Sequence, residues 1–125
     1  MKLFELKQAR SFEMWYYSVS RKQLLLRSNK SVDEGIESRL EVLFTGVISI
    51  NMPTIVLLDC IYASEAKDAV IKGDLEFSKD LQIYQLGKVP VGYIASIYFQ
   101  IDESNLEFYE PSRILTDVGV SKSIE

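Results

Sequence analysis

The segment from Arg39 to Asn51 alternates apolar and polar side chains with a period of two. This is the period of a β-strand, in which successive side chains point to opposite faces of the sheet. The alternation therefore predicts a long strand with one face in the core and the other, which includes Glu41, largely in water. The predicted core face consists of Leu40, Val42, Phe44, Gly46, Ile48 and Ile50. Because Gly46 lies in the middle, we expect a bulge or bend that turns the strand around a corner.

A second β-rich stretch, EMWYYSVSRKQLLLRS, runs from residue 13 to residue 28. Extended geometry places Trp15 on the same face as Tyr17. Met14 and Tyr16 share the opposite face, together with the preceding Phe12. Both faces of this predicted strand are therefore partly apolar.

Short strands are expected along much of the remaining chain. A break at Arg10 and Ser11 separates a first strand from the one that begins at Phe12. The polar residues 20–23 predict a four-residue hairpin loop. The other predicted strands cover residues 2–9, 24–27, 55–63, 81–86, 91–101 and 106–109.

The clearest helix signal lies at residues 64–73. Ser64 can cap an unpaired amide at the start of a helix, and Gly73 suits the left-handed position that follows its end. The chain lacks the strand–helix–strand alternation that a parallel sheet requires. The predicted fold is mainly β (α+β), an antiparallel curled sheet in the form of a barrel or sandwich, with one short helix near residues 64–73.

The length and composition indicate one folded domain. A chain of 125 residues is close to the usual size of a single domain. Its 47% hydrophobic content is too high for intrinsic disorder. Residues 1–115 are expected to form a single globular β-rich domain, and residues 116–125, which are small and polar, a flexible C-terminal tail.

Charge and cysteine content favour a cytoplasmic protein. The net charge of −4 argues against a nucleic-acid partner, because such proteins usually carry a basic patch. The charged N-terminus lacks the apolar region of a signal peptide, and no apolar run approaches the roughly 20 residues of a membrane helix. The single cysteine, Cys60, suits a reducing compartment.

The chain lacks the residues of several common catalytic schemes, although carboxylates, tyrosines, lysines and serines remain. It has no histidine, one cysteine and no glycine-rich phosphate fingerprint. We therefore expect no enzymatic activity, no catalytic residue, no metal site and no cofactor. Ser64 and Lys67 match the Ser-x-x-Lys spacing of penicillin-recognising enzymes, but their companion motifs are missing and a helix cap explains the same residues. Acidic groups near residues 33–37 and 102–110 fit solvated surface better than a carboxylate-based hydrolase or a calcium site.

Aromatic residues beside basic ones are the most suggestive feature of the chain. Three interpretations are open: a filled β core, a surface for a protein partner, or a site for a nucleic acid or small ligand. The core interpretation carries the most weight and the partner surface comes second. The candidate binding residues are Trp15, Tyr16, Tyr17, Arg27, Tyr93 and Tyr98.

Three strings of the chain resemble a family of small bacterial proteins of unknown function. They are WYYSVS with LLLRS, LFTGVISI with its following proline, and YIASIYF with LEFYEP. The chain is also similar in type to immunity proteins, which neutralise toxins. The resemblance implies a bacterial, non-enzymatic whole domain.

Two functional hypotheses follow. The first is a non-catalytic protein-interaction domain of immunity or regulatory type that binds a protein partner. The alternative is a small-ligand-binding β-barrel with an aromatic-lined cavity formed by Trp15, Tyr17, Tyr93 and Tyr98. Neither nucleic acid nor membrane is an expected partner, and the oligomeric state stays open, with a homodimer among the options.

Overall fold

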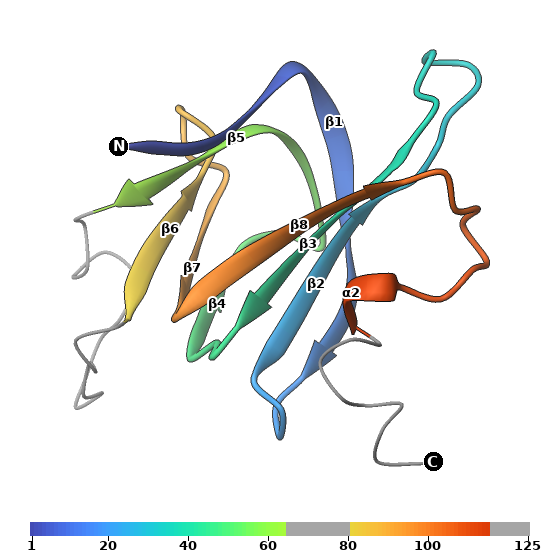
Figure 1. Cartoon of the computed structure of the whole chain (residues 1–125). Helices are drawn as coiled ribbons and strands as arrows, with labels where there is room; N and C mark the ends of the chain where they lie inside the picture. The colour runs from blue at the N-terminus through green and yellow to red at the C-terminus, as the bar shows by residue number, and fades with distance from the viewer. Residues whose placement is uncertain (65–80, 116–125) are drawn as a thin grey trace.

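The computed structural model describes residues 1–64 and 81–115, which form eight strands and one short helix (Figure 1). The strands build a single antiparallel sheet, which confirms the mainly β prediction. The helix predicted at 64–73 lies outside the described residues except for Ser64, which ends a strand, and the predicted tail at 116–125 also lies outside them. The elements are β1 (Lys2–Ser18), β2 (Gln23–Ser28), β3 (Arg39–Thr45), β4 (Ser49–Asn51), β5 (Ile55–Ser64), β6 (Gln82–Leu86), β7 (Gly92–Ser96), β8 (Tyr98–Ser104) and α2 (Arg113–Leu115).

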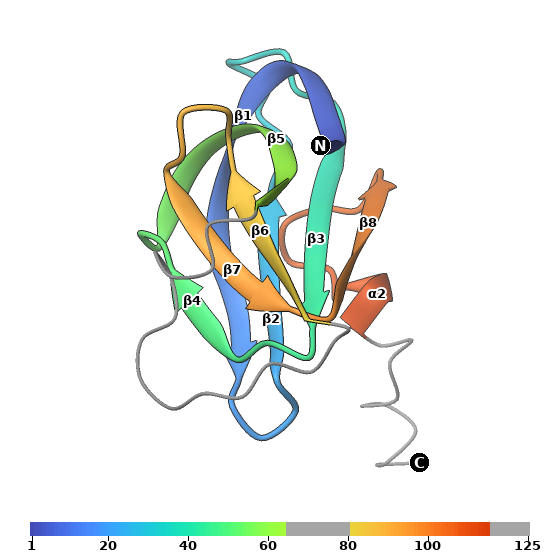
Figure 2. The same cartoon turned by 90° about the vertical axis from the view of Figure 1, so that its left-hand side faces the viewer.

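The sheet is curled but not closed into a barrel. Its strand order is β4-β7-β6-β5-β1-β2-β3-β8, so β4 and β8 lie at its two ends. The chain passes from β3 to β4 and from β7 to β8 at one corner, which Figure 2 shows at the lower end of the sheet. The two chain segments are hydrogen bonded there, because the Ile97 amide donates to the Thr45 carbonyl at 3.0 Å and the Ile48 amide to the Ala95 carbonyl at 2.9 Å.

Gly46 makes this corner, as its position in the sequence predicted. Its φ of +73° lies in the left-handed region, which other residues rarely adopt. A Cβ atom at this position would lie 2.7 Å from Cγ1 of Ile97. Both the backbone angle and the close approach therefore require glycine.

The predicted break at Arg10 and Ser11 is wrong, because β1 is one strand of 17 residues. Its pairing with β5 shifts register between Glu5 and Arg10, so the strand is irregular there but continues. The Arg10 guanidinium is buried and donates hydrogen bonds to the side chains and carbonyls of Ser28 and Ser38. These bonds satisfy its N–H groups within the protein. Arg10, which was expected to end a strand at the surface, instead connects β1 to Ser28 and Ser38 by buried hydrogen bonds.

The predicted alternation in β1 also fails after Met14. The pairing of β1 with β2 shifts register between Met14 and Tyr16, which is a β-bulge around Trp15. Met14 packs against the main core, whereas Tyr16 packs against Leu25 and Leu43 on the other face of the sheet. The extra residue therefore places Met14 and Tyr16 on opposite faces.

The concave face of the curled sheet holds the main hydrophobic core. Phe44, Tyr84 and Phe99 contact one another there with ring centroids 5.1 to 5.7 Å apart. The predicted inward residues Leu40, Val42 and Phe44 are all buried in this core. Its buried members are Phe12, Leu24, Leu26, Leu40, Val42, Phe44, Val47, Val56, Leu58, Ile61, Tyr84, Leu86 and Ile94.

The opposite, outer face of β2 and β3 is buried as well, so the prediction that it is largely wet is wrong. Glu41 is fully buried, and Leu25 and Leu43 pack against Ile114 of α2. Figure 1 shows why: the chain leaves β8 as a loop and returns to α2, which packs against β3 and β8. Residues 106–109, predicted as a strand, belong to this returning loop.

Candidate functional site

Three charged residues lie buried side by side on the outer face of β2 and β3. Arg27 and Glu41 are paired across the two strands, and Nε of Arg27 donates to Oε2 of Glu41 at 2.7 Å. Nη2 of Arg39 lies 3.7 Å from Oε1 of the same carboxylate. Burial lowers the pKa of Arg39, and the negative charge of Glu41 opposes that shift. Two guanidinium groups face one carboxylate, so further acceptors are needed to offset their burial.

Backbone carbonyl groups of the segment after β8 supply these acceptors. Arg27 donates from Nη1 to the Phe108 carbonyl at 3.0 Å. Arg39 donates from Nη1 to the carbonyls of Glu107 (2.8 Å) and Glu110 (2.7 Å), and from Nη2 to that of Pro111 (3.1 Å). Four carbonyl groups from residues 107–111 are therefore held by two buried arginines.

The segment held in this way forms a β-turn whose central residues are Phe108 and Tyr109. The Glu110 amide donates to the Glu107 carbonyl at 3.0 Å, and the Glu107 amide donates to the Glu110 side chain at 2.9 Å. Lys30 adds an ion pair with the Glu107 carboxylate at 2.7 Å. Because the backbone faces the arginines, the two aromatic side chains point outward and are 64% and 73% exposed. Their rings meet edge to face, with centroids 5.5 Å apart.

Trp15 lies against the same arginine that holds the turn. The guanidinium carbon of Arg27 is 4.2 Å from the centre of the Trp15 ring, and 39% of Trp15 is exposed. The β-bulge described above gives Trp15 this position. The indole and the aromatic turn are thus joined through one buried guanidinium.

Two aliphatic side chains extend this surface onto β5. Glu13 of β1 is paired with Arg27 on one side and with Ile55 on the other, so all three lie in one row on the outer face. Ile55 and its neighbour on that face, Leu57, are 59% and 66% exposed. We call the set Trp15, Ile55, Leu57, Phe108 and Tyr109 the aromatic surface.

The six candidate binding residues do not form one site. Arg27 and Trp15 lie together, but Arg27 is buried and serves the fold. Tyr16 packs in a small cluster with Leu25, and Tyr17 is exposed near the end of β1. Tyr93 packs on a separate cluster near β6, and Tyr98 is exposed on the edge strand β8.

The four aromatic residues expected to line a ligand cavity also lie apart from the main core. None of Trp15, Tyr17, Tyr93 and Tyr98 belongs to the cluster on the concave face. Three of them are exposed at the surface, and Tyr93 packs against Leu81, Ile83 and Ala95. This placement favours surface roles over a shared cavity.

Sequence reasoning missed four members of the aromatic surface as site residues. The sequence assigns Ile55 and Leu57 only to a β-rich run, although their alternation with the buried Val56 and Leu58 marks an exposed apolar face. The sequence predicts a strand at Phe108 and Tyr109 and includes both in the suggestive aromatic set, but not among the candidate binding residues. The signal that identifies a turn is the pair of glutamates at 107 and 110, followed by Pro111.

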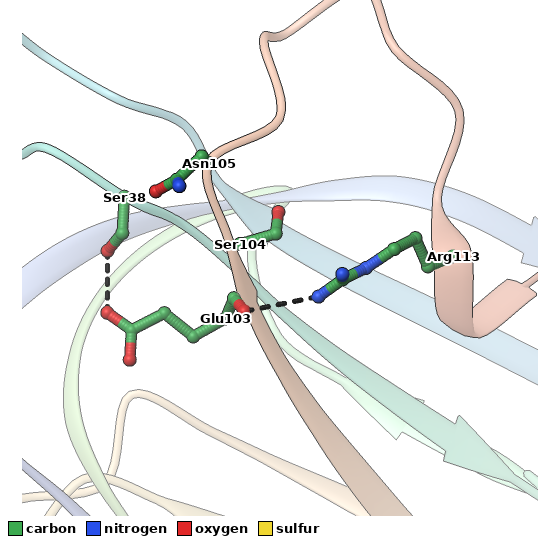
Figure 3. A pocket seen from close by; sticks show the side chains of 5 residues that line it. All are labelled: Ser38, Glu103, Ser104, Asn105 and Arg113. Atoms are coloured by element: carbon green, nitrogen blue, oxygen red, sulfur yellow. Dashed lines mark hydrogen bonds between the residues drawn. The ribbon is translucent and has the colours of Figure 1, made fainter.

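A polar depression of about 320 Å³ lies at the C-terminal end of β8. It is lined by Ser38, Glu103, Ser104, Asn105 and Arg113 (Figure 3). Ser38 donates to the Glu103 carboxylate at 2.6 Å, and Arg10 donates to the Ser38 hydroxyl at 3.2 Å. Arg113 is paired with Asp102 at 2.7 Å. The charged groups of this depression are engaged with neighbouring protein groups. The depression also lacks the apolar lining that is typical of small-molecule sites.

Comparison of the chain with family models, curated proteins and solved structures found no match. Among residues 1–64 and 81–115, no helix has the length and apolar character needed to cross a bilayer. In the same part of the chain, no three acidic, cysteine or histidine side chains are grouped to hold a metal ion. The aromatic surface is therefore the candidate site that the geometry supports best.

Proposed function

We propose that the chain is a non-catalytic protein-interaction domain, of immunity or regulatory type, that binds a protein partner through the aromatic surface. The observation that supports this most is the Phe108–Tyr109 pair, displayed on a turn whose backbone two buried arginines hold. Aromatic residues fixed in this way lose little conformational entropy on binding. They have the chemistry of the anchor residues that dominate protein interfaces.

The energetics of the turn support binding rather than folding. Phe108 and Tyr109 are mostly exposed and so add little to the stability of the domain. Burying such a side chain in a partner contributes roughly 1.5–3 kcal/mol. Trp15 and the aliphatic pair Ile55 and Leu57 extend the area that a partner would cover.

The charges around the surface indicate what kind of partner fits. Glu13 is exposed between Ile55 and Arg27, and Glu110 flanks the aromatic turn, where Glu107 is already paired with Lys30. The positive charge of Arg27 is buried, and the chain as a whole is acidic. The complementary partner is a protein with an apolar concave patch and a rim of lysine and arginine.

A pull-down from native lysate, repeated with the products of neighbouring genes co-expressed, tests the proposal. We expect the wild-type chain to recover a stoichiometric partner and the double variant F108A/Y109A to lose it. Val89→Ala, another exposed apolar site in a turn, is the matched control and should retain the partner. No recovered partner, or equal recovery by F108A/Y109A, would contradict the proposal.

A further inference from the structure

Among the strands of residues 1–64 and 81–115, β8 pairs on one side only, with β3. The Thr45 carbonyl accepts from the Ile97 amide, so Thr45 directs its backbone groups toward β8. The backbone amide and carbonyl groups of an antiparallel pair alternate in direction from one residue to the next. Tyr98 is paired with Thr45 and Gln100 with Leu43, so the backbone groups of both residues point toward β3. The amide and carbonyl groups of Phe99 and Ile101 therefore point away from the sheet.

Arg113 supports this assignment and limits the open stretch. Its Nη2 atom donates to the Glu103 carbonyl at 3.3 Å, as expected if Glu103, like Ile101, points away from β3. This contact occupies the carbonyl of Glu103. In the part of the chain that the structure describes, no strand lies beyond β8. In this part of the chain, the residues of β8 with both outward backbone groups open are thus Phe99 and Ile101, and at Glu103 only the amide is open.

This edge lacks the usual protection against pairing. Natural edge strands are commonly short or carry proline, lysine or a bulge. The strand at the other end of the sheet, β4, has three residues and Pro53 close behind it. β8 has seven residues and contains neither proline nor lysine. Its acidic pair, Asp102 and Glu103, stands only at the end that Arg113 contacts.

We propose that β8 pairs with β8 of a second copy of this chain, antiparallel about a two-fold axis at Gln100. The two residues whose outward amide and carbonyl are both open, Phe99 and Ile101, are placed symmetrically about Gln100. The axis pairs Phe99 with Ile101 of the second copy, and Ile101 with its Phe99. The amide and carbonyl groups of Phe99 and Ile101, four in each chain, are then satisfied, and the two sheets continue across the axis.

The side chains in this register are compatible. Gln100 faces Gln100 of the second copy, whose amides can bond each other, and Tyr98 faces Asp102. The apolar Ile101, which is 37% exposed, lies beside Phe99. No two like charges are opposed. An axis at Ile101 instead pairs Phe99 with Glu103, whose carbonyl already binds Arg113, so the Gln100 register is favoured.

Charge substitutions at Gln100 test both the dimer and its register. Light scattering after gel filtration should give the wild type twice the chain mass of 14.3 kDa at about 100 µM. Gln100 is exposed, so Q100K should fold normally, yet it places two like charges opposite each other and should weaken the dimer at least about tenfold. Val32→Lys, on an exposed loop, is the control that should remain dimeric. Q100E alone should also dissociate, and an equimolar mixture of Q100K and Q100E should form a heterodimer.

Cysteine cross-linking gives an independent readout. Gln100 and its counterpart form a non-hydrogen-bonded pair, in which Cα atoms lie about 4.5 Å apart. Under mild oxidation Q100C should form a disulfide-linked dimer, while the wild type, whose Cys60 is buried, should not. A wild type that is monomeric at about 100 µM overturns the proposal. A dimer that Q100K leaves intact and Q100C fails to cross-link also overturns it, because such a dimer uses another face.

Discussion

The guanidinium of Arg27 lies 4.2 Å from the ring centre of Trp15 while donating to the Phe108 carbonyl at 3.0 Å. One buried cation thus connects the indole of β1 to a turn that follows Arg27 by 81 residues in the chain. The exposed aromatic groups and the buried charged groups are therefore connected by direct contacts within one chain. Its parts make separate predictions, because some residues should act on stability and others on binding.

Replacing Arg39 should unfold the domain readily. Arg39→Met removes the hydrogen bonds to Glu107, Glu110 and Pro111 and leaves Glu41 with one cation. Removing one partner of a buried ion pair lowers the free energy of unfolding by about 3–5 kcal/mol. Urea unfolding followed by circular dichroism measures the loss. Arg21→Met, on the exposed hairpin loop, is the control and should change stability by less than about 0.5 kcal/mol; equal stability of the two variants would refute the role given to Arg39.

Replacing the turn aromatics should leave stability almost unchanged. Phe108→Ala and Tyr109→Ala remove side chains that are mostly exposed, so each should shift the unfolding free energy by about 0.5 kcal/mol or less. Phe44→Ala, in the main core, should cost about 3–5 kcal/mol in the same urea titration. A large loss for Phe108→Ala would mean that the turn aromatics serve folding instead of binding.

Trp15 should contribute through its contact with Arg27. Trp15→Ala removes the ring that covers the guanidinium and should destabilise the domain by about 1–2 kcal/mol. Trp15→Phe keeps an aromatic face and should recover part of that loss. Thermal melts followed by circular dichroism compare the two variants; identical melting of Trp15→Ala and the wild type would show that the stacking is energetically silent.

Gly46→Ala should strain the corner of the sheet in two ways. A left-handed φ costs a residue with a Cβ about 1–2 kcal/mol, and the contact with Ile97 adds overpacking of about 1–3 kcal/mol. The double variant G46A/I97A removes the contacts with Cγ1 and Cδ1 of Ile97 but keeps the approach to its Cβ at 3.0 Å and the backbone strain. It should therefore lie closer to Ile97→Ala than the single variant lies to the wild type, as a double-mutant cycle in urea would measure.

Stability should fall at alkaline pH. Burial raises the pKa of the Cys60 thiol above its ordinary 9.0 and that of Tyr84 above its ordinary 10.0. Both groups then ionise more readily in the unfolded chain, so their contribution is complete below pH 9.0 and is lost as pH rises. Urea midpoints between pH 7 and 11 should decline from about 9, and Cys60→Ala should delay the onset toward 10; a flat profile would contradict this.

The sequence predicts the sheet better than the site. Alternation around Gly46 located strand β3 and the corner after it, because a half-buried strand imposes a period of two on its side chains; the single strand predicted over residues 39–51 is divided at that corner into β3 and β4. The same rule failed after Met14, since a bulge adds one residue that alternation cannot reveal. It also failed for Glu41, because whether the outer face is wet depends on where residues 105–115 return.

The aromatic surface depends on contacts between distant parts of the chain. Arg27 was identified as a candidate beside Trp15, yet its burial follows from carbonyl groups that no side-chain pattern encodes. Arg39 was overlooked because a charged residue at the start of a strand is usually solvated. Phe108 and Tyr109 are exposed only because these two arginines hold the backbone beneath them.

The buried Arg27–Glu41 pair should also favour one alignment of β2 and β3 over others. Both strands are so rich in leucine, valine and phenylalanine that apolar burial alone would tolerate a slip of two residues. One such slip would place Arg27 opposite Arg39, and the other would place it opposite Leu43. Each leaves a charge buried without its counterion, which costs several kcal/mol. The charged pair should therefore destabilise the misaligned sheets, which apolar burial alone would not distinguish from the native one.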